Sequence, residues 1–141
     1  MRCRALVASV LCVFAVGACV APQSGYMQHI AEPHWSQSVD VRYANNDTVS
    51  LRTVSLAVRY NALFKADSLA VVVRLTAPDG RWYEEPFVMR MARPYTSSTV
   101  ATVESVPYRV DSRMDMRGDY IFSITPLVAV DGVEAVGVEI E

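Results

Sequence analysis

The stretch Val54-Ser55-Leu56-Ala57-Val58-Arg59-Tyr60 alternates large apolar residues with small or polar ones. Successive side chains of a β-strand point to opposite faces, so this alternation predicts a strand with one face in a core and the other toward water. Residues 69–75 repeat the pattern with Leu69, Val71, Val73 and Leu75 and end before Pro78-Asp79-Gly80, which is typical of a tight turn. These two stretches favour a sheet protein.

Other segments extend the same pattern along the chain. Short strand-like runs, separated by turn residues such as Asn45-Asn46-Asp47 and Asp131-Gly132, cover residues 39–43, 82–89, 98–104, 107–111, 120–124 and 136–140. Many short strands at intervals of roughly 8 to 12 residues, with almost no amphipathic helix, predict an all-β fold. We expect an antiparallel two-sheet sandwich, immunoglobulin-like in kind, with a small barrel as the alternative.

The amino-terminal residues have the pattern of a secretion signal. Met1-Arg2-Cys3-Arg4 supplies positive charge, residues 5–16 are apolar, and Val16-Gly17-Ala18-Cys19 resembles a bacterial lipobox. The apolar run is too short to span a bilayer, which needs roughly 20 residues. We therefore predict a signal peptide over residues 1–18 and lipidation at Cys19, the alternative being an ordinary signal cleaved after Ala18 or Ala21.

The predicted mature chain is the size of one domain. Residues 19–141 number 123 and carry 11 basic against 15 acidic residues, a balance that does not suggest nucleic acid as a partner. Residues 19–34 lack a regular period and are expected to form a lipidated tether, followed by the sandwich domain over residues 35–141. Cys3, Cys12 and Cys19 all lie in or beside the signal, so no disulfide is expected.

Enzymatic activity is not predicted. The sequence has no histidine after His34 to act as a base for a nucleophile, and the adjacent Glu84 and Glu85 would point to opposite faces of a strand. His29, Glu32 and His34 fit no closed metal site, so we expect neither a metal nor another cofactor.

Four residues are candidates for contact with a partner or ligand. Arg59 and Arg74 occupy outward positions of two strands that we expect to be neighbours, where they could bind an anion or simply solvate an exposed face. Trp82 and Tyr83 could stack on a sugar, although a large aromatic residue of a sandwich usually belongs to the core.

Several segments together resemble the gliding-motility lipoprotein GldH family of Bacteroidetes. Besides the lipobox, the resemblance covers residues 35 to 141. It lies in Trp35, Ser55-Leu56-Ala57-Val58-Arg59-Tyr60-Asn61, Asp67-Ser68-Leu69, Val106-Pro107-Tyr108-Arg109, Gly118-Asp119-Tyr120-Ile121-Phe122-Ser123-Ile124 and residues 130–140. It implies a non-enzymatic lipoprotein tied to surface gliding and type IX secretion, with no established ligand. This sequence departs from the family pattern at residues 63–66 and 93–98.

The residues after Cys19 bear on location. Val20-Ala21-Pro22-Gln23 contains no acidic cluster resembling the surface-export signal of Bacteroidetes lipoproteins, and no Asp follows Cys19 to suggest inner-membrane retention. We therefore expect a lipid anchor in the outer membrane, a periplasm-facing domain and an envelope protein as partner, with a periplasmic glycan- or peptide-binding module as the alternative.

Overall fold

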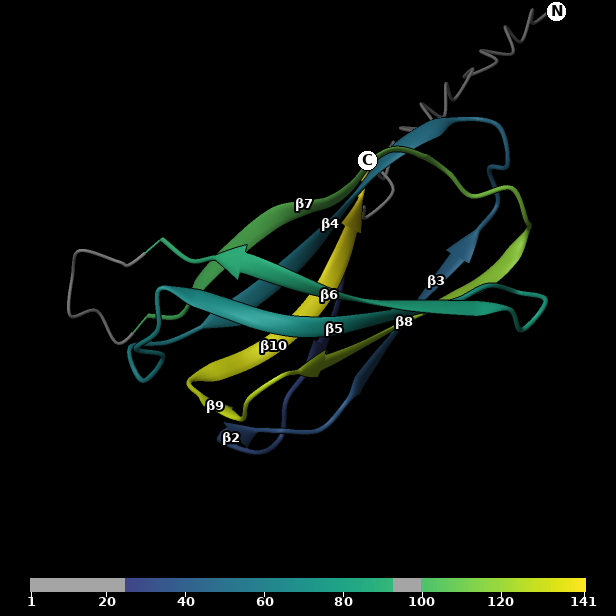
Figure 1. Ribbon diagram of the computed structural model, residues 1–141. Coiled ribbons are helices and arrows are strands. Elements are labelled where there is room, and N and C mark those ends of the chain that lie inside the picture. The colour runs from purple at the N-terminus through teal and green to yellow at the C-terminus, as the bar shows by residue number, and fades with distance from the viewer. Residues whose placement is uncertain (1–24, 93–99) are drawn as a thin grey trace, which may run out of the picture.

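The computed structural model describes residues 25–92 and 100–141, and these form an antiparallel β-sandwich (Figure 1). The prediction of an all-β, two-sheet antiparallel fold is therefore confirmed. The strands are β1 (Gly25–His29), β2 (His34–Trp35), β3 (Val39–Asn45), β4 (Leu51–Tyr60), β5 (Ser68–Thr76), β6 (Trp82–Arg90), β7 (Thr102–Arg113), β8 (Gly118–Pro126), β9 (Val130–Asp131) and β10 (Val133–Ile140). No helix of these residues is long and apolar enough to cross a membrane.

The strand order is that of a jelly roll. Sheet I has the order β1-β10-β4-β7, sheet II has the order β3-β8-β5-β6, and β2 pairs with β9 in a small separate ribbon. When the strands of the two large sheets are numbered along the chain without β2 and β9, the orders are 1-8-3-6 and 2-7-4-5, as in double Greek-key jelly rolls. An immunoglobulin domain pairs consecutive strands three times, whereas among the strands described here β5 and β6 are the only consecutive ones that pair within a large sheet.

The core lies between the two large sheets and is built from the alternation seen in the sequence. On β4 the side chains of Val54, Leu56, Val58 and Tyr60 are buried, and on β5 those of Leu69, Val71 and Val73 face them from the other sheet. Trp35 is only 2% exposed and donates its indole N–H to the carbonyl oxygen of Gln37 at 2.7 Å. Asn45 is the one polar residue buried among those described.

Two segments differ from their predictions. The expected tether over residues 19–34 is wrong in its second half, because Gly25–His29 pairs with β10 and His34–Trp35 pairs with β9. The side chains of β1 from residue 26 to residue 29 are exposed, so the pairing of β1 rests on backbone hydrogen bonds. The sequence of β1 therefore shows no alternation of apolar and polar residues that would predict a strand. The two short strands expected over 98–104 and 107–111 are one strand, β7, whose register against β4 shifts twice between Arg52 and Ser55.

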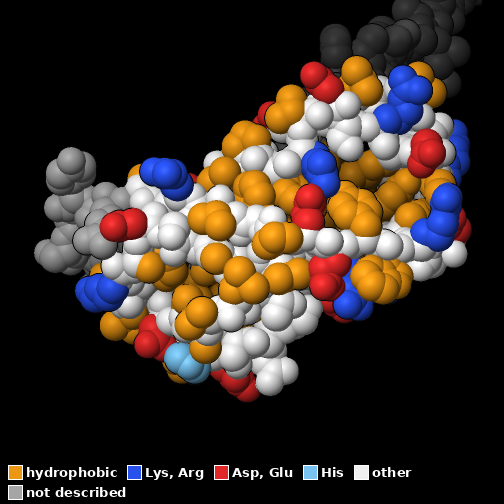
Figure 2. All heavy atoms as spheres, viewed as in Figure 1, with side chains coloured by type: hydrophobic (Ala, Val, Ile, Leu, Met, Phe, Trp, Pro, Cys, Tyr) orange, Lys and Arg blue, Asp and Glu red, His pale blue; other side chains and the backbone are white. Residues whose placement is uncertain are grey.

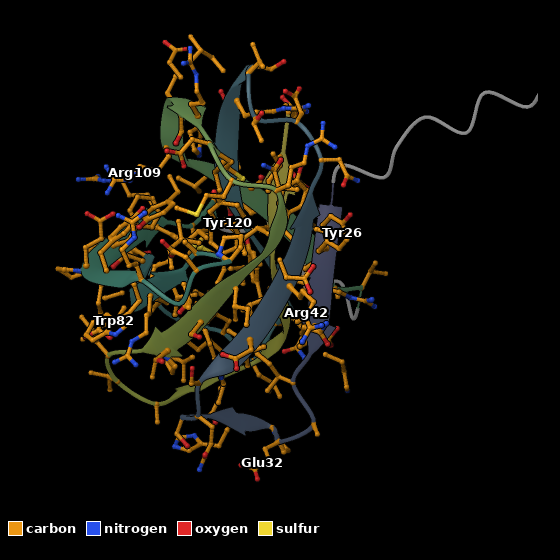
Figure 3. The ribbon with its side chains drawn as sticks, turned by 90° about the vertical axis from the view of Figure 1, so that its right-hand side faces the viewer. Tyr26, Glu32, Arg42, Trp82, Arg109 and Tyr120 are labelled. Atoms are coloured by element: carbon orange, nitrogen blue, oxygen red, sulfur yellow. The ribbon has the colours of Figure 1, made fainter. Side chains whose placement is uncertain are left out.

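The two long sides of the sandwich are different. At one side the edge strands β1 and β3 meet, and the rings of Tyr26 and Tyr43 lie edge to face with centroids 5.6 Å apart. At the other side the edge strands are β6 and β7, which contain Pro86 and Pro107. Figure 3 shows Trp82 and Arg109 on the side of the molecule opposite Tyr26.

Candidate functional site

A groove opens between β6 and β7 at the end of the sandwich that carries the β5–β6 turn. Its volume is about 280 Å³, and apolar side chains of both sheets and of the segment between β7 and β8 line it, namely Val54, Leu75, Met114, Met116, Tyr120 and Phe122. Figure 2 shows hydrophobic side chains gathered in a hollow on this face, and Tyr120 lies in the interior in Figure 3. Leu75 and Met116 are half-buried, whereas the other four residues of this lining are buried in the core.

The far wall of the groove is the segment between β7 and β8, and a buried amide holds it in place. Asn45 is 2% exposed and donates both hydrogens of its side-chain amide, one to the carbonyl oxygen of Met114 at 3.0 Å and one to that of Met116 at 2.8 Å. The backbone N–H of Met116 donates to the hydroxyl of Tyr120 at 3.2 Å. Because these polar groups are satisfied, the wall is fixed before any ligand arrives.

A cluster centred on Glu85 joins β6 to β7 at the closed end of the groove. The Tyr108 hydroxyl donates to Glu85 at 2.5 Å, and the Arg109 guanidinium forms an ion pair with the same carboxylate. Phe87 packs edge to face against Tyr108, with ring centroids 5.2 Å apart. Burial, followed by the hydrogen bond to Glu85, raises the pKa of the Tyr108 hydroxyl, so it stays a donor at neutral pH.

Three arginines lie on the rim of the groove, and they differ in whether a carboxylate pairs with them. Arg81 forms an ion pair with Asp79 at 2.5 Å, and Arg109 is neutralised by Glu85 while lying 5.6 Å from the Tyr83 ring centroid. No ion pair or side-chain hydrogen bond joins Arg113 to another of the residues that the structure describes. Arg113 is exposed and is therefore the cation of this rim that is open to a ligand.

Two of the four predicted contact residues belong to this region. Tyr83 is 42% exposed and lies on the inward side of β6, beside Arg109. Trp82 is 59% exposed, and the guanidinium carbon of Arg74 lies 4.4 Å from its ring centroid. Trp82 therefore lies on the surface, whereas Trp35 lies in the core.

The prediction that Arg59 and Arg74 lie on neighbouring strands is wrong. Arg59 is on β4 of sheet I and Arg74 is on β5 of sheet II, because the chain crosses between sheets after β4. Each forms its own ion pair, Arg59 with Glu134 at 3.1 Å and Arg74 with Glu84 at 2.8 Å. The two arginines thus do not form one anion-binding pair.

The remaining candidate residues lie elsewhere. Cys19 falls outside the described residues. His34 pairs with Asp131, with Nδ1 2.7 Å from Oδ1, and within the described part of the chain no group of His, Cys, Asp and Glu side chains is arranged to hold a metal. Glu84 and Glu85 contact different partners on opposite faces of β6, as expected for adjacent strand residues.

Sequence reasoning missed most of the groove. Tyr108, Arg109 and Arg113 lie on the strand that was divided in two, and Asn45 was assigned to a turn. The sequence gives no clear signal for one long edge strand here, because Glu104 is on the half-buried side of β7 and Val103 is on its exposed side. A search of protein-family models and a search of curated proteins found no match to the chain.

Proposed function

We propose that the chain is a non-enzymatic, lipid-anchored envelope protein that binds a partner protein through the groove between β6 and β7. The observation that carries this proposal is the groove on the β6–β7 side of the sandwich, which is lined by the half-buried Leu75 and Met116 and by the exposed Tyr83. Aromatic residues, methionine and arginine are enriched at protein interfaces, and all three types line this groove.

The location belongs to the same proposal and rests on the sequence. The lipobox pattern at residues 16–19 supports acylation of Cys19, and two or three acyl chains anchor a protein stably. The residues after Cys19 support the periplasmic face of the outer membrane. The resemblance to gliding-motility lipoproteins supports a role beside gliding or type IX secretion proteins.

The anchor can be tested separately from the groove. We expect Cys19→Ser to release the protein from the envelope fraction on sedimentation, whereas Cys12→Ser, inside the predicted signal, should leave it bound. Sedimentation of the Cys19→Ser protein with the envelope would contradict lipidation at that residue.

The partner can be tested by capture from gently solubilised envelopes. Truncation of a central interface aromatic commonly costs 2 kcal/mol or more, so Tyr83→Ala should lower partner recovery about 30-fold. Arg59→Ala, on the outer face of sheet I away from the groove, is the matched control and should leave recovery unchanged. Equal recovery with the two variants, or repeated recovery of the protein alone, would contradict the proposal.

Trp82 supports a second candidate function, that of a glycan-binding module. Its exposed ring is of the kind on which sugars stack, and Arg74 supports it at 4.4 Å. Titration with envelope oligosaccharides should then shift tryptophan emission in the wild type and not in Trp82→Phe, because Trp35 is buried. An unchanged wild-type spectrum would rule out sugar stacking on this ring.

A further inference from the structure

We propose that the groove between β6 and β7 binds the carboxyl-terminal residue of a partner polypeptide, with an apolar side chain inside the groove and the terminal carboxylate at Arg113. This inference rests on the proposed function and names the chemistry of the partner that the groove accepts. Four observations lead to it: the size of the groove, the charges on its rim, the free edges of its walls and the rigidity of those walls.

The size and lining of the groove fit one bulky residue. Its 280 Å³ is slightly below the roughly 300 to 1,000 Å³ of typical small-molecule pockets. The half-buried Leu75 and Met116 present carbon and sulfur surface to it. An apolar side chain of the size of leucine or phenylalanine would be desolvated there, and a longer segment would extend out of the groove.

The charges on the rim specify a single carboxylate. Arg81 and Arg109 are already paired with Asp79 and Glu85, which leaves Arg113 as the exposed guanidinium without a carboxylate partner among the described residues. Asp115 also lines the groove and would repel further negative charge. A run of acidic residues is therefore disfavoured, whereas one terminal carboxylate can take a bidentate contact with Arg113.

The edge strands favour a peptide over a fatty acid with the same carboxylate. Among the strands that the structure describes, β6 pairs with β5 alone and β7 pairs with β4 alone, so one side of each strand has backbone donors and acceptors that could pair with an extended peptide. Pro86 and Pro107 have no N–H, so such pairing is interrupted at both positions. The edges thus accept a short peptide end rather than a long added strand.

The walls of this site are fixed independently of a ligand. Asn45 holds the carbonyl oxygens of Met114 and Met116, and Glu85 ties Tyr108 and Arg109 together across β6 and β7. A preformed groove spares a short peptide part of the ordering cost of binding.

The test is calorimetric titration of the full-length protein in detergent with a hexapeptide of serine and threonine that ends in phenylalanine. We expect the free acid to bind at least tenfold more tightly than the same peptide with an amidated end, because the charge-assisted contact at Arg113 is lost in the amide. Replacing the final phenylalanine by serine should weaken binding by a similar factor. Arg113→Gln should abolish the preference for the acid, and Arg117→Gln, exposed but outside the groove lining, should retain it.

Several results would overturn the inference. Equal affinity for acid and amide, no binding of the acid, or an unchanged preference in Arg113→Gln would each do so, as would decanoate binding as tightly as the peptide. Arg113→Lys provides a second variant that keeps the charge and should keep part of the preference. The titration needs no envelope partner, so loss of capture in Tyr83→Ala with no acid preference would leave the proposed function standing and remove only this inference.

Discussion

Gly137 on β10 lies opposite Met27 on β1, so close that a β carbon at position 137 would stand 2.7 Å from the Cα atom of Met27. The same β carbon would overlap the carbonyl oxygen of Tyr26. Because the side chains of β1 are exposed, its pairing rests on backbone hydrogen bonds, and the close approach of the two backbones is what allows these bonds to form. Glycine at position 137 is therefore a requirement of the fold and leaves no signal in the hydrophobic pattern.

Gly137→Ala is expected to displace β1 and to lower the free energy of unfolding by about 1 to 3 kcal/mol, the usual cost of forcing extra atoms into a packed site. Amide hydrogen exchange should show the loss concentrated in residues 25–29. Gly80→Ala is the contrasting variant, because Gly80 has a φ of 85° but open space around it. It should cost about 1 to 2 kcal/mol through left-handed strain alone and leave exchange in β1 unchanged. Unaltered exchange of β1 in Gly137→Ala would contradict the close approach.

Asn45→Ala is expected to destabilise the protein by about 2 to 3 kcal/mol, because the carbonyl oxygens of Met114 and Met116 lose the buried amide that they share. Urea unfolding measures this change. Asn46→Ala, at the exposed neighbouring position, should stay within about 0.5 kcal/mol of the wild type. A similar stability for the two variants would show that the wall of the groove does not depend on Asn45.

Asp47 is expected to make stability depend on pH in the acid range. Hydrogen bonds from the side chain and backbone of Ser50, and from the backbone of Val49, lower the pKa of the Asp47 carboxyl from its ordinary 3.8. A carboxyl with a lowered folded-state pKa stabilises the fold fully above its unfolded pKa and loses that contribution as the pH falls below it. The stability difference between wild type and Asp47→Asn should therefore be constant above about pH 5 and shrink below pH 4. Urea unfolding of both proteins across this range checks it, and a difference that grows toward low pH would reverse the sign of the argument.

The two tryptophans should respond differently to a quencher. Trp82 is 59% exposed and Trp35 is 2% exposed, so acrylamide should quench only part of the wild-type emission readily. Trp82→Phe should leave emission that resists quenching, and Trp35→Phe should leave emission that is quenched readily, provided that the core tolerates that substitution. Equal quenching of the two variants would contradict the assignment of Trp82 to the surface.

The fold class was predictable because alternation is a local property. Val54 to Tyr60 and Leu69 to Leu75 each show their buried face directly in the sequence. The pairing of strands was not predictable, because it depends on which sheet the chain enters after each turn. Arg59 and Arg74 illustrate this, since both were correctly placed on exposed faces and incorrectly placed on neighbouring strands.

The groove was only partly predictable for a related reason. Tyr83 and Trp82 could be named from the sequence because aromatic residues are common at binding sites. The roles of Arg113 and Asn45 depend on the tertiary contacts of their segments. Asn45 in particular is a common turn residue, and its burial follows from the carbonyl groups of a segment about 70 positions further along the chain. The sequence around Asn45 gives no sign of hydrogen-bond partners so far along the chain.

β10 follows every other strand in the chain, yet it lies between β1 and β4 in the middle of sheet I. Until residues 133–140 have been synthesised, β1 lacks the strand with which it pairs, and β4 has a partner on one side only, β7. A nascent chain that ends before residue 133 therefore contains no complete sheet I. The topology thus makes completion of this sheet wait for the strand that comes last among those described.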